Sequence, residues 1–155
     1  MTEEGADARG TLRTIVDGNA YLTLATADAS GRPWGTPVWF AHDGYTDFLW
    51  LSRPAARHSQ NIAVRPEIAI TIFDSTVPVG EGQAVYVEAT AQEVGGPEVE
   101  RGVGICARRQ VAHGVAAWGV AQVTGDAPFR LFRARASAHF VLDDHDQRIA
   151  VDPTP

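Results

Sequence analysis

Apolar residues recur at every second position in several short stretches of the chain, and this period of two constrains the fold more than any other sequence feature. Such alternation places one face of a β-strand toward a core. Strands are predicted at residues 21–27, 33–41, 46–52, 67–74, 83–92 and 129–142, with a possible partner at 148–151. Short turns, such as "DASGR" at 28–32 and a predicted turn at 42–44, join them as antiparallel neighbours. The pattern predicts a mainly β protein, a closed or nearly closed antiparallel β-barrel of six strands.

Three helices are predicted to flank this barrel and to pack at its ends. They are expected at residues 6–16, at residues 55–64 and after Pro97. The length of 155 residues suits one hydrophobic core, so residues 1–155 are predicted to form a single domain. The strand at 67–74 alternates Ile with Ala, Thr and Phe, so both of its faces are expected to be buried.

The charged residues limit the classes of function. Thirteen basic residues, all of them arginine, stand against nineteen acidic residues and give a net charge of -6. An acidic chain lacks the basic face of a sequence-independent nucleic-acid binder, and a chain without lysine has neither Schiff-base chemistry nor a phosphate-loop lysine. No stretch has the apolar length of a membrane span, and the N-terminus is acidic where a secretory signal is basic. A cytoplasmic protein without nucleic-acid or membrane partners is therefore predicted.

Cysteine and histidine usage gives no sign of a metal site. Cys106 is the single cysteine, which rules out a disulfide framework and a cysteine-based zinc site, and it is predicted to be a core residue. The segment "HFVLDDHD" at 139–146 holds side chains that could bind a divalent metal. A polar cluster of this kind is more typical of a solvated turn, so no metal ligand is predicted.

The stretch "LWLSRPAARHSQN" at 49–61 passes from an apolar strand to the start of a helix. Ser52 ends the strand, and Arg57 and His58 lie near the beginning of the helix. A helix N-terminus offers backbone N–H groups to an anion, and arginine and protonated histidine add charged donors. Together these residues predict a phosphate site, although each alone would also fit a cap or a solvated surface charge.

The strand "RPWGTPVWF" at 32–40 is unusual because Gly35 and Pro37 lie in its interior. Both residues weaken a strand, since glycine lacks a side chain to pack and proline lacks a backbone donor. A planar ligand lying against this backbone would compensate for the loss. The alternative is an edge strand whose proline blocks aggregation.

The order of "TLATADASGRPWGTPVWF", "FLWLSRPAARHSQNIAVRPEIAITIFD" and "GQAVYVEATAQEV" resembles the pyridoxamine 5'-phosphate oxidase-like family of flavin-binding split barrels, over about residues 21–94. The resemblance implies a six-stranded antiparallel split barrel of the FMN-binding type, and a homodimer with two flavin mononucleotides (FMN) at its interface. It also assigns cofactor-binding residues. These are Thr36, Pro37, Val38 and Trp39 along the flavin ring, Leu51, Ser52, Arg57 and His58 at the phosphate and ribityl chain, and Gln83 reaching the flavin.

Two departures from the family pattern bear on function. His58 stands where the family usually has a lysine. A phosphate beside His58 should favour its charged form, so flavin affinity is expected to fall as the pH rises past the pKa of His58. The sequence ends "DQRIAVDPTP", without the Arg-x-His segment that binds pyridoxamine phosphate in the true oxidase. Vitamin B6 oxidation is therefore not expected.

The resemblance implies a flavin-dependent oxidoreductase with a small-molecule substrate, in which the redox chemistry occurs at the flavin ring. One alternative is a reductase that uses the 8-hydroxy-5-deazaflavin coenzyme, for whose longer acidic tail Arg53 and Arg65 are candidates. Another is a non-catalytic protein that binds flavin or haem, with His113 or His139 as the candidate axial ligand. Three tryptophans would belong either to the core or to an apolar wall for a flat substrate: Trp39, Trp50 and Trp118.

Overall fold

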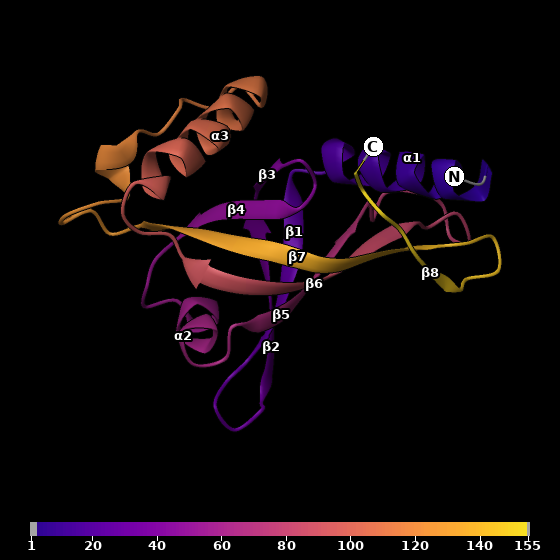
Figure 1. Cartoon of the computed structure of the whole chain (residues 1–155), viewed down its shortest axis with the longest axis horizontal. Helices are drawn as coiled ribbons and strands as arrows, with labels where there is room; N and C mark the ends of the chain where they lie inside the picture. The colour runs from indigo at the N-terminus through magenta and orange to yellow at the C-terminus, as the bar shows by residue number, and fades with distance from the viewer. Residues whose placement is uncertain (1–2, 155) are drawn as a thin grey trace.

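The computed structural model describes residues 3–154, so Met1, Thr2 and Pro155 of the predicted domain lie outside the described residues. The helices are α1 (Glu3–Gly18), α2 (Arg57–Val64) and α3 (Glu98–Ala112), with a 3₁₀ turn η1 (Val120–Gln122). The strands are β1 (Tyr21–Ala27), β2 (Pro33–Trp39), β3 (Ala41–Asp43), β4 (Asp47–Ser52), β5 (Glu67–Phe73), β6 (Ala84–Glu93), β7 (Arg130–Leu142) and β8 (Arg148–Ala150). Figure 1 shows one curved sheet with α2 and α3 toward one end and α1 at the other.

All paired strands are antiparallel, in the order β2-β1-β5-β6-β7-β4-β3, with β8 added to β7. The edge strands β2 and β3 are joined by Phe40, so the sheet curls into a half-barrel. The predicted mainly β fold with flanking helices is confirmed. The described chain has eight strands rather than six: β8 is the partner predicted at 148–151, and β3 separates at Phe40 from the predicted strand at 33–41. The turn predicted at 42–44 is wrong: Ala41–Asp43 forms β3, and the turn follows with Tyr45 at a φ of 61°.

The main core lies between the sheet and α1. Alternate side chains of β1, β5 and β6 point into it, as the period of two predicts, and Leu12 and Val16 of α1 pack against them. Its largest fully buried side chains are aromatic: Trp50, Phe40 and Phe48. Of the two roles predicted for Trp50, the structure therefore shows the core role.

Strand β4 is buried on both faces, which explains its continuous apolar run. Phe48 and Trp50 point into the main core, whereas Leu49 packs into a second cluster beneath α3. Cys106 of α3 belongs to this second cluster, and burial raises the pKa of its thiol to about 12. Cys106 is thus an inert core residue, as the sequence predicts.

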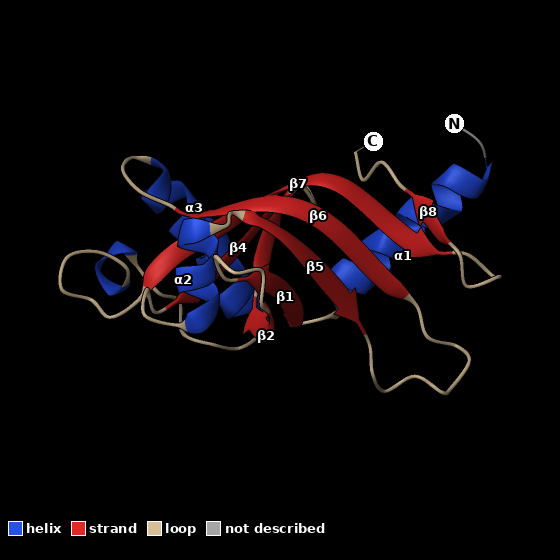
Figure 2. Ribbon diagram, turned by 90° about the horizontal axis from the view of Figure 1, so that it is seen from below, coloured by secondary structure: helices blue, strands red, loops and turns tan. Residues whose placement is uncertain are grey.

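Strand β5 differs from its prediction, because its outer face is open in the single chain. Ile68, Ile70 and Ile72 are buried, but Ala69 is exposed and Phe73 is 51% exposed. Figure 2 shows that no helix lies in front of this face of β5 and β6. The face therefore presents small and aromatic side chains to the outside.

Gly102 and Gly104 of α3 provide a matched pair of stability tests. A Cβ at Gly102 would lie 2.5 Å from Cδ2 of the buried Leu131, whereas one at Gly104 would meet its nearest neighbour at 3.8 Å. Alanine favours a helix over glycine by ~1 kcal/mol, so Gly104→Ala should raise the free energy of unfolding by about 0.5–1 kcal/mol. Gly102→Ala should lower it by about 1–2 kcal/mol because overpacking outweighs that gain. Urea unfolding measures both, and a stabilised Gly102→Ala variant would contradict tight packing of α3 on β7.

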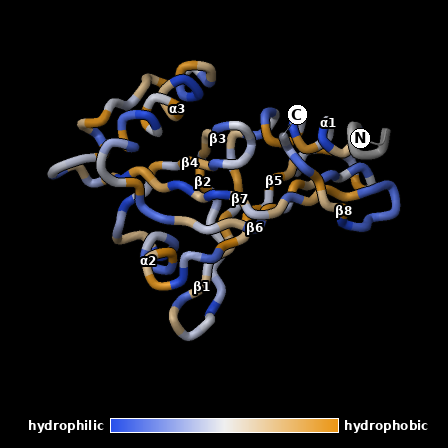
Figure 3. The backbone as a smooth tube through the Cα atoms, viewed as in Figure 1, coloured by the Kyte–Doolittle hydropathy of each residue, from blue (hydrophilic) through white to orange (hydrophobic). Residues whose placement is uncertain are grey.

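The segment between β7 and β8 is a hydrophilic turn, blue in Figure 3. Asp143 Oδ1 accepts hydrogen bonds from the backbone N–H groups of His145 and Gln147. Among the side chains of residues 7–154, no group of three His, Cys, Asp or Glu is placed to hold a metal ion. In the same part of the chain, no helix combines the length and apolar character needed to cross a bilayer.

Candidate functional site

The end of β4 and the start of α2 meet in a buried polar pair. Ser52 is the last residue of β4, and its Oγ lies 2.8 Å from Nε2 of His58 in the first turn of α2. Both residues are buried. Burial lowers the pKa of His58 because it disfavours the charged imidazolium. His58 therefore holds the Ser52 hydroxyl in place from within the protein.

The helix start beside this pair has the features of an anion site. α2 begins at Arg57, two residues later than predicted, because a hydrogen bond from the Ala56 N–H to the Arg53 carbonyl closes a turn before it. In the described chain no side chain caps α2, so its first N–H groups remain available to a ligand. The guanidinium carbon of the exposed Arg57 lies 4.2 Å from the centre of the Trp34 ring on β2. Within residues 7–154 it has no carboxylate partner, unlike Arg135.

Strand β2 runs along the open edge of the sheet and leads away from this helix start. Trp34, beside Arg57, and Trp39 are five residues apart, which is about 16 Å in an extended strand. Between them, the buried Thr36 Oγ1 has no hydrogen-bond partner among the described residues. Trp39 Nε1 donates to His113 Nδ1 at 3.1 Å, and the two rings meet edge to face. Arg57 and His113 thus mark the two ends of one edge strand.

The other cofactor-binding residues predicted on β2 and β4 differ in what they offer to this edge. Pro37 is exposed, whereas Val38 points into the main core. Leu51 is half-buried and packs against the cluster beneath α3. Only main-chain groups of Val38 and Leu51 would therefore face a ligand.

A buried set of hydrogen bonds, which was not predicted from the sequence, connects α2 to β2. Asn61 Nδ2 donates to Thr26 Oγ1 at 3.0 Å, and the Thr26 hydroxyl donates to the Trp34 carbonyl at 3.4 Å. Thr26 and Asn61 are each 4% exposed. These hydrogen bonds fix α2, through Asn61, against the strand that carries Trp34. No local motif signals them, because Asn61 and Thr26 are 35 residues apart.

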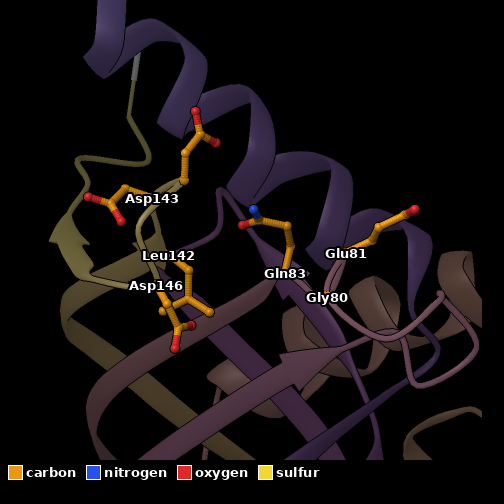
Figure 4. A pocket seen from close by; sticks show the side chains of 8 residues that line it. Gly80, Glu81, Gln83, Leu142, Asp143 and Asp146 are labelled. Carbon is orange, nitrogen blue, oxygen red and sulfur yellow. The ribbon is translucent and has the colours of Figure 1, made fainter.

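Gln83 lies at the opposite end of the sheet from the α2 site. Gln83 precedes β6, whose 10 residues span about 30 Å in an extended strand. The other end of β6 is separated from the end of β4 only by β7. Figure 4 shows Gln83 at a pocket of about 540 Å³ that it shares with the acidic Glu81 and Asp143. The buried Gln83 Oε1 finds no partner in the described structure. A single chain therefore does not bring Gln83 to the α2 site.

Arg65 and Arg53, the candidates for binding a longer acidic tail, have other contacts. Arg65 donates from Nε and Nη2 to the carbonyls of Asp28 and Ala29, at 3.2 and 3.3 Å, and so holds the β1–β2 turn. The Arg53 guanidinium carbon lies 4.8 Å from the centre of the Phe129 ring. Arg65 is therefore used by the fold, and Arg53 stacks at the start of β7.

His113 and His139, the candidate axial ligands, both use ring nitrogens in hydrogen bonds. An indole N–H can only donate, so the contact with Trp39 makes His113 Nδ1 an acceptor and places the ring proton on Nε2. His139 Nε2 donates to the Tyr45 carbonyl at 2.7 Å, and His139 is buried. An iron ligand needs an unprotonated and accessible ring nitrogen. Trp39 engages Nδ1 of His113, and the unprotonated Nδ1 of His139 belongs to a buried side chain.

Stability is expected to fall as the pH drops below about 6.5. Burial lowers the pKa of both His58 and His139, so in this range the unfolded chain binds more protons than the folded chain. Each histidine can remove up to about 1.4 kcal/mol per pH unit from the free energy of unfolding. Urea unfolding between about pH 7.5 and pH 5.5 measures the slope. His139→Gln, which keeps an N–H donor, should flatten the slope; a slope equal to that of the wild type would contradict the assignment.

Comparison with known proteins identifies the family of this chain. The family described as Pyridoxamine 5'-phosphate oxidase matches residues 9–142, and no curated protein matches the chain. A haem-binding protein from Mycobacterium smegmatis has a similar structure, with a TM-score of 0.73 and 18% identity over 94% of this chain and 57% of that one. The haem storage protein HutZ from Vibrio cholerae has a TM-score of 0.68 and 21% identity over 85% of this chain and 92% of that one. An F420 reductase has a TM-score of 0.57 and 18% identity over 77% of this chain and 88% of that one.

These similarities agree on the architecture. The chain spans just over half the length of the M. smegmatis protein, and at such identities a structural likeness shows the fold alone. The family match, in contrast, covers β1 through β7 and the three helices apart from the beginning of α1. The chain therefore belongs to the pyridoxamine 5'-phosphate oxidase family and has its split-barrel fold.

Proposed function

We propose that this chain is a cytoplasmic FMN-binding oxidoreductase that acts on a small-molecule substrate as a homodimer. The observation that carries the proposal is the Arg57 guanidinium, which lies at the uncapped start of α2 without a carboxylate partner among the described residues. A phosphate there would receive the backbone N–H groups of the first turn, the charged guanidinium and the Ser52 hydroxyl that His58 holds.

The edge strand β2 suits the rest of the cofactor. A flavin lying along it would have its phosphate at Arg57 and its ring toward Trp39. The polar edge of such a ring would supply the partner that Thr36 Oγ1 lacks within the described chain. A planar ring would also pack against the flat, exposed backbone at Gly35 and Pro37.

A second copy of the chain would complete this site. Gln83 lies about 30 Å along β6 from the α2 end, so it would reach the flavin of the other chain rather than its own. The open outer face of the sheet supports such an arrangement, because Tyr21 and Phe73 are 61% and 51% exposed and the small Ala69 of β5 is also exposed. Packing of this face against a partner would bury β5 on both sides, as its sequence pattern favours.

Bound FMN supplies electron and hydride transfer at its ring, and the chain supplies binding, orientation and exclusion of water. Trp39 and Trp118 are half-buried near the ring end of β2 and would form an apolar wall for a flat substrate. His113 carries its ring proton on Nε2 and so would donate a hydrogen bond at that end.

Haem and the deazaflavin F420 are the alternatives, because similar structures are described as haem-binding proteins and as an F420 reductase. The side chains of this protein favour them less. Trp39 engages Nδ1 of His113, His139 is buried, and Arg65 is committed to the β1–β2 turn.

Analytical ultracentrifugation with and without FMN tests the dimer and the cofactor separately. The expected result is a dimer that carries one FMN per chain. A monomer that binds FMN would contradict the shared site, and a dimer that binds haem but not FMN would contradict the cofactor.

A further inference from the structure

We infer that Trp34 is a positioning residue of the phosphate site, whose indole face holds the Arg57 guanidinium in place for the phosphate of the cofactor. The inference rests on the proposed FMN site and adds a residue that does not itself touch the phosphate. Trp34 is 40% exposed, on a strand that no neighbouring strand pairs with on its outer side within the described sheet. A core role therefore does not account for it.

The contact between Trp34 and Arg57 joins two elements that are already fixed relative to each other. The guanidinium carbon lies 4.2 Å from the ring centre, well within the range of a cation–π interaction. The Trp34 backbone is tied to α2 through Thr26 and Asn61. Because Arg57 is the first residue of α2, its side chain begins from a fixed position and ends against a fixed ring.

Stacking leaves the hydrogen-bonding edge of the guanidinium unused. A guanidinium stacks through its flat face, whereas its five N–H donors lie in the plane and point outward. Arg109 also stacks on a ring, that of Phe40, but it donates to the Asn19 carbonyl as well. The Arg57 guanidinium, in contrast, makes no hydrogen bond within residues 7–154. Trp34 thus restricts the freedom of Arg57 without occupying its donors, which lowers the entropy lost on binding.

The experiment compares FMN with riboflavin, which has the same ring but no phosphate. Dissociation constants for both are measured by flavin fluorescence on the full chain and on Trp34→Leu, Trp34→Phe, Arg57→Ala and the double variant Trp34→Leu/Arg57→Ala. Trp34→Leu should weaken FMN binding by about two- to five-fold, as expected for an exposed cation–π contact, and leave riboflavin binding unchanged. Trp34→Phe should keep most of the FMN affinity because phenylalanine also offers a ring face. In the Arg57→Ala background, Trp34→Leu should have no further effect.

The outcomes separate this inference from the proposed function. If the wild-type chain binds no FMN, the proposed function fails and the inference fails with it. If the wild type binds FMN but Trp34→Leu leaves the affinity unchanged, weakens riboflavin binding equally, or adds its full effect to that of Arg57→Ala, the inference alone is overturned. Equal urea midpoints of wild type and Trp34→Leu show that the change acts on the site rather than on folding.

Discussion

Arg57→Ala is expected to weaken FMN binding by about 10- to 150-fold. A hydrogen bond to a charged group contributes about 1.5–3 kcal/mol, which corresponds to that change in the dissociation constant. The side chain is exposed and makes no ion pair within the described chain, so its loss should lower the free energy of unfolding by no more than about 1 kcal/mol, the value of its exposed contact with the Trp34 ring. The effect is therefore expected mainly on affinity.

Arg108→Ala is the matched control for this prediction. Arg108 is an exposed arginine on α3, so the substitution removes the same charge at a distance from the start of α2. Fluorescence titration with FMN should give the wild-type dissociation constant for Arg108→Ala and a strongly raised one for Arg57→Ala. If the two variants bound FMN equally, Arg57 would have no place in the phosphate site.

Trp50→Ala is expected to lower the free energy of unfolding by about 3–5 kcal/mol. Trp50 is fully buried at the centre of the main core, where its ring stacks on Phe132 with centroids 5.9 Å apart. Removing this side chain leaves a cavity that the surrounding strands cannot fill. Since a domain is stable by only about 5–15 kcal/mol, the variant should lose a large share of its stability, measured as a shift of the urea midpoint.

Trp50→Phe separates packing from hydrogen bonding at the same position. Trp50 Nε1 is buried and lacks a hydrogen-bond partner in the described part of the chain, so replacing the indole with a phenyl ring removes an unsatisfied donor. We expect the free energy of unfolding of this variant to fall by only about 1 kcal/mol, because removal of the unsatisfied donor partly offsets the cost of the smaller void. A Trp50→Ala variant as stable as Trp50→Phe would show that the core does not depend on this ring.

The contact between Ser52 and His58, on which the proposed phosphate site draws, could be predicted from the sequence because its parts are local. Ser52 and His58 are six residues apart, and the passage from strand to helix brings them together. Similarly, the alternation of β6 predicts correctly which of its side chains point inward. Motifs and periods act over such distances, so the positions of most strands along the chain follow from them, and the start of α2 follows to within two residues.

The remaining features depend on contacts between distant parts of the chain. The stacking of Trp34 on Arg57 requires both the pairing of β1 with β2 and the docking of α2. His113 meets Trp39 across 74 residues, so its tautomer has no local signal. The expected burial of both faces of β5 fails in one chain because a pattern of apolar residues does not say which surface covers them.

Titration of the purified chain with FMN, followed by flavin fluorescence and the visible absorption spectrum, tests the central claim most directly. The account predicts saturable binding with micromolar or tighter affinity, one FMN per chain, and much weaker binding of riboflavin because the phosphate contacts are lost. No FMN binding, together with a Soret band on addition of haem or saturable binding of the deazaflavin, would contradict it.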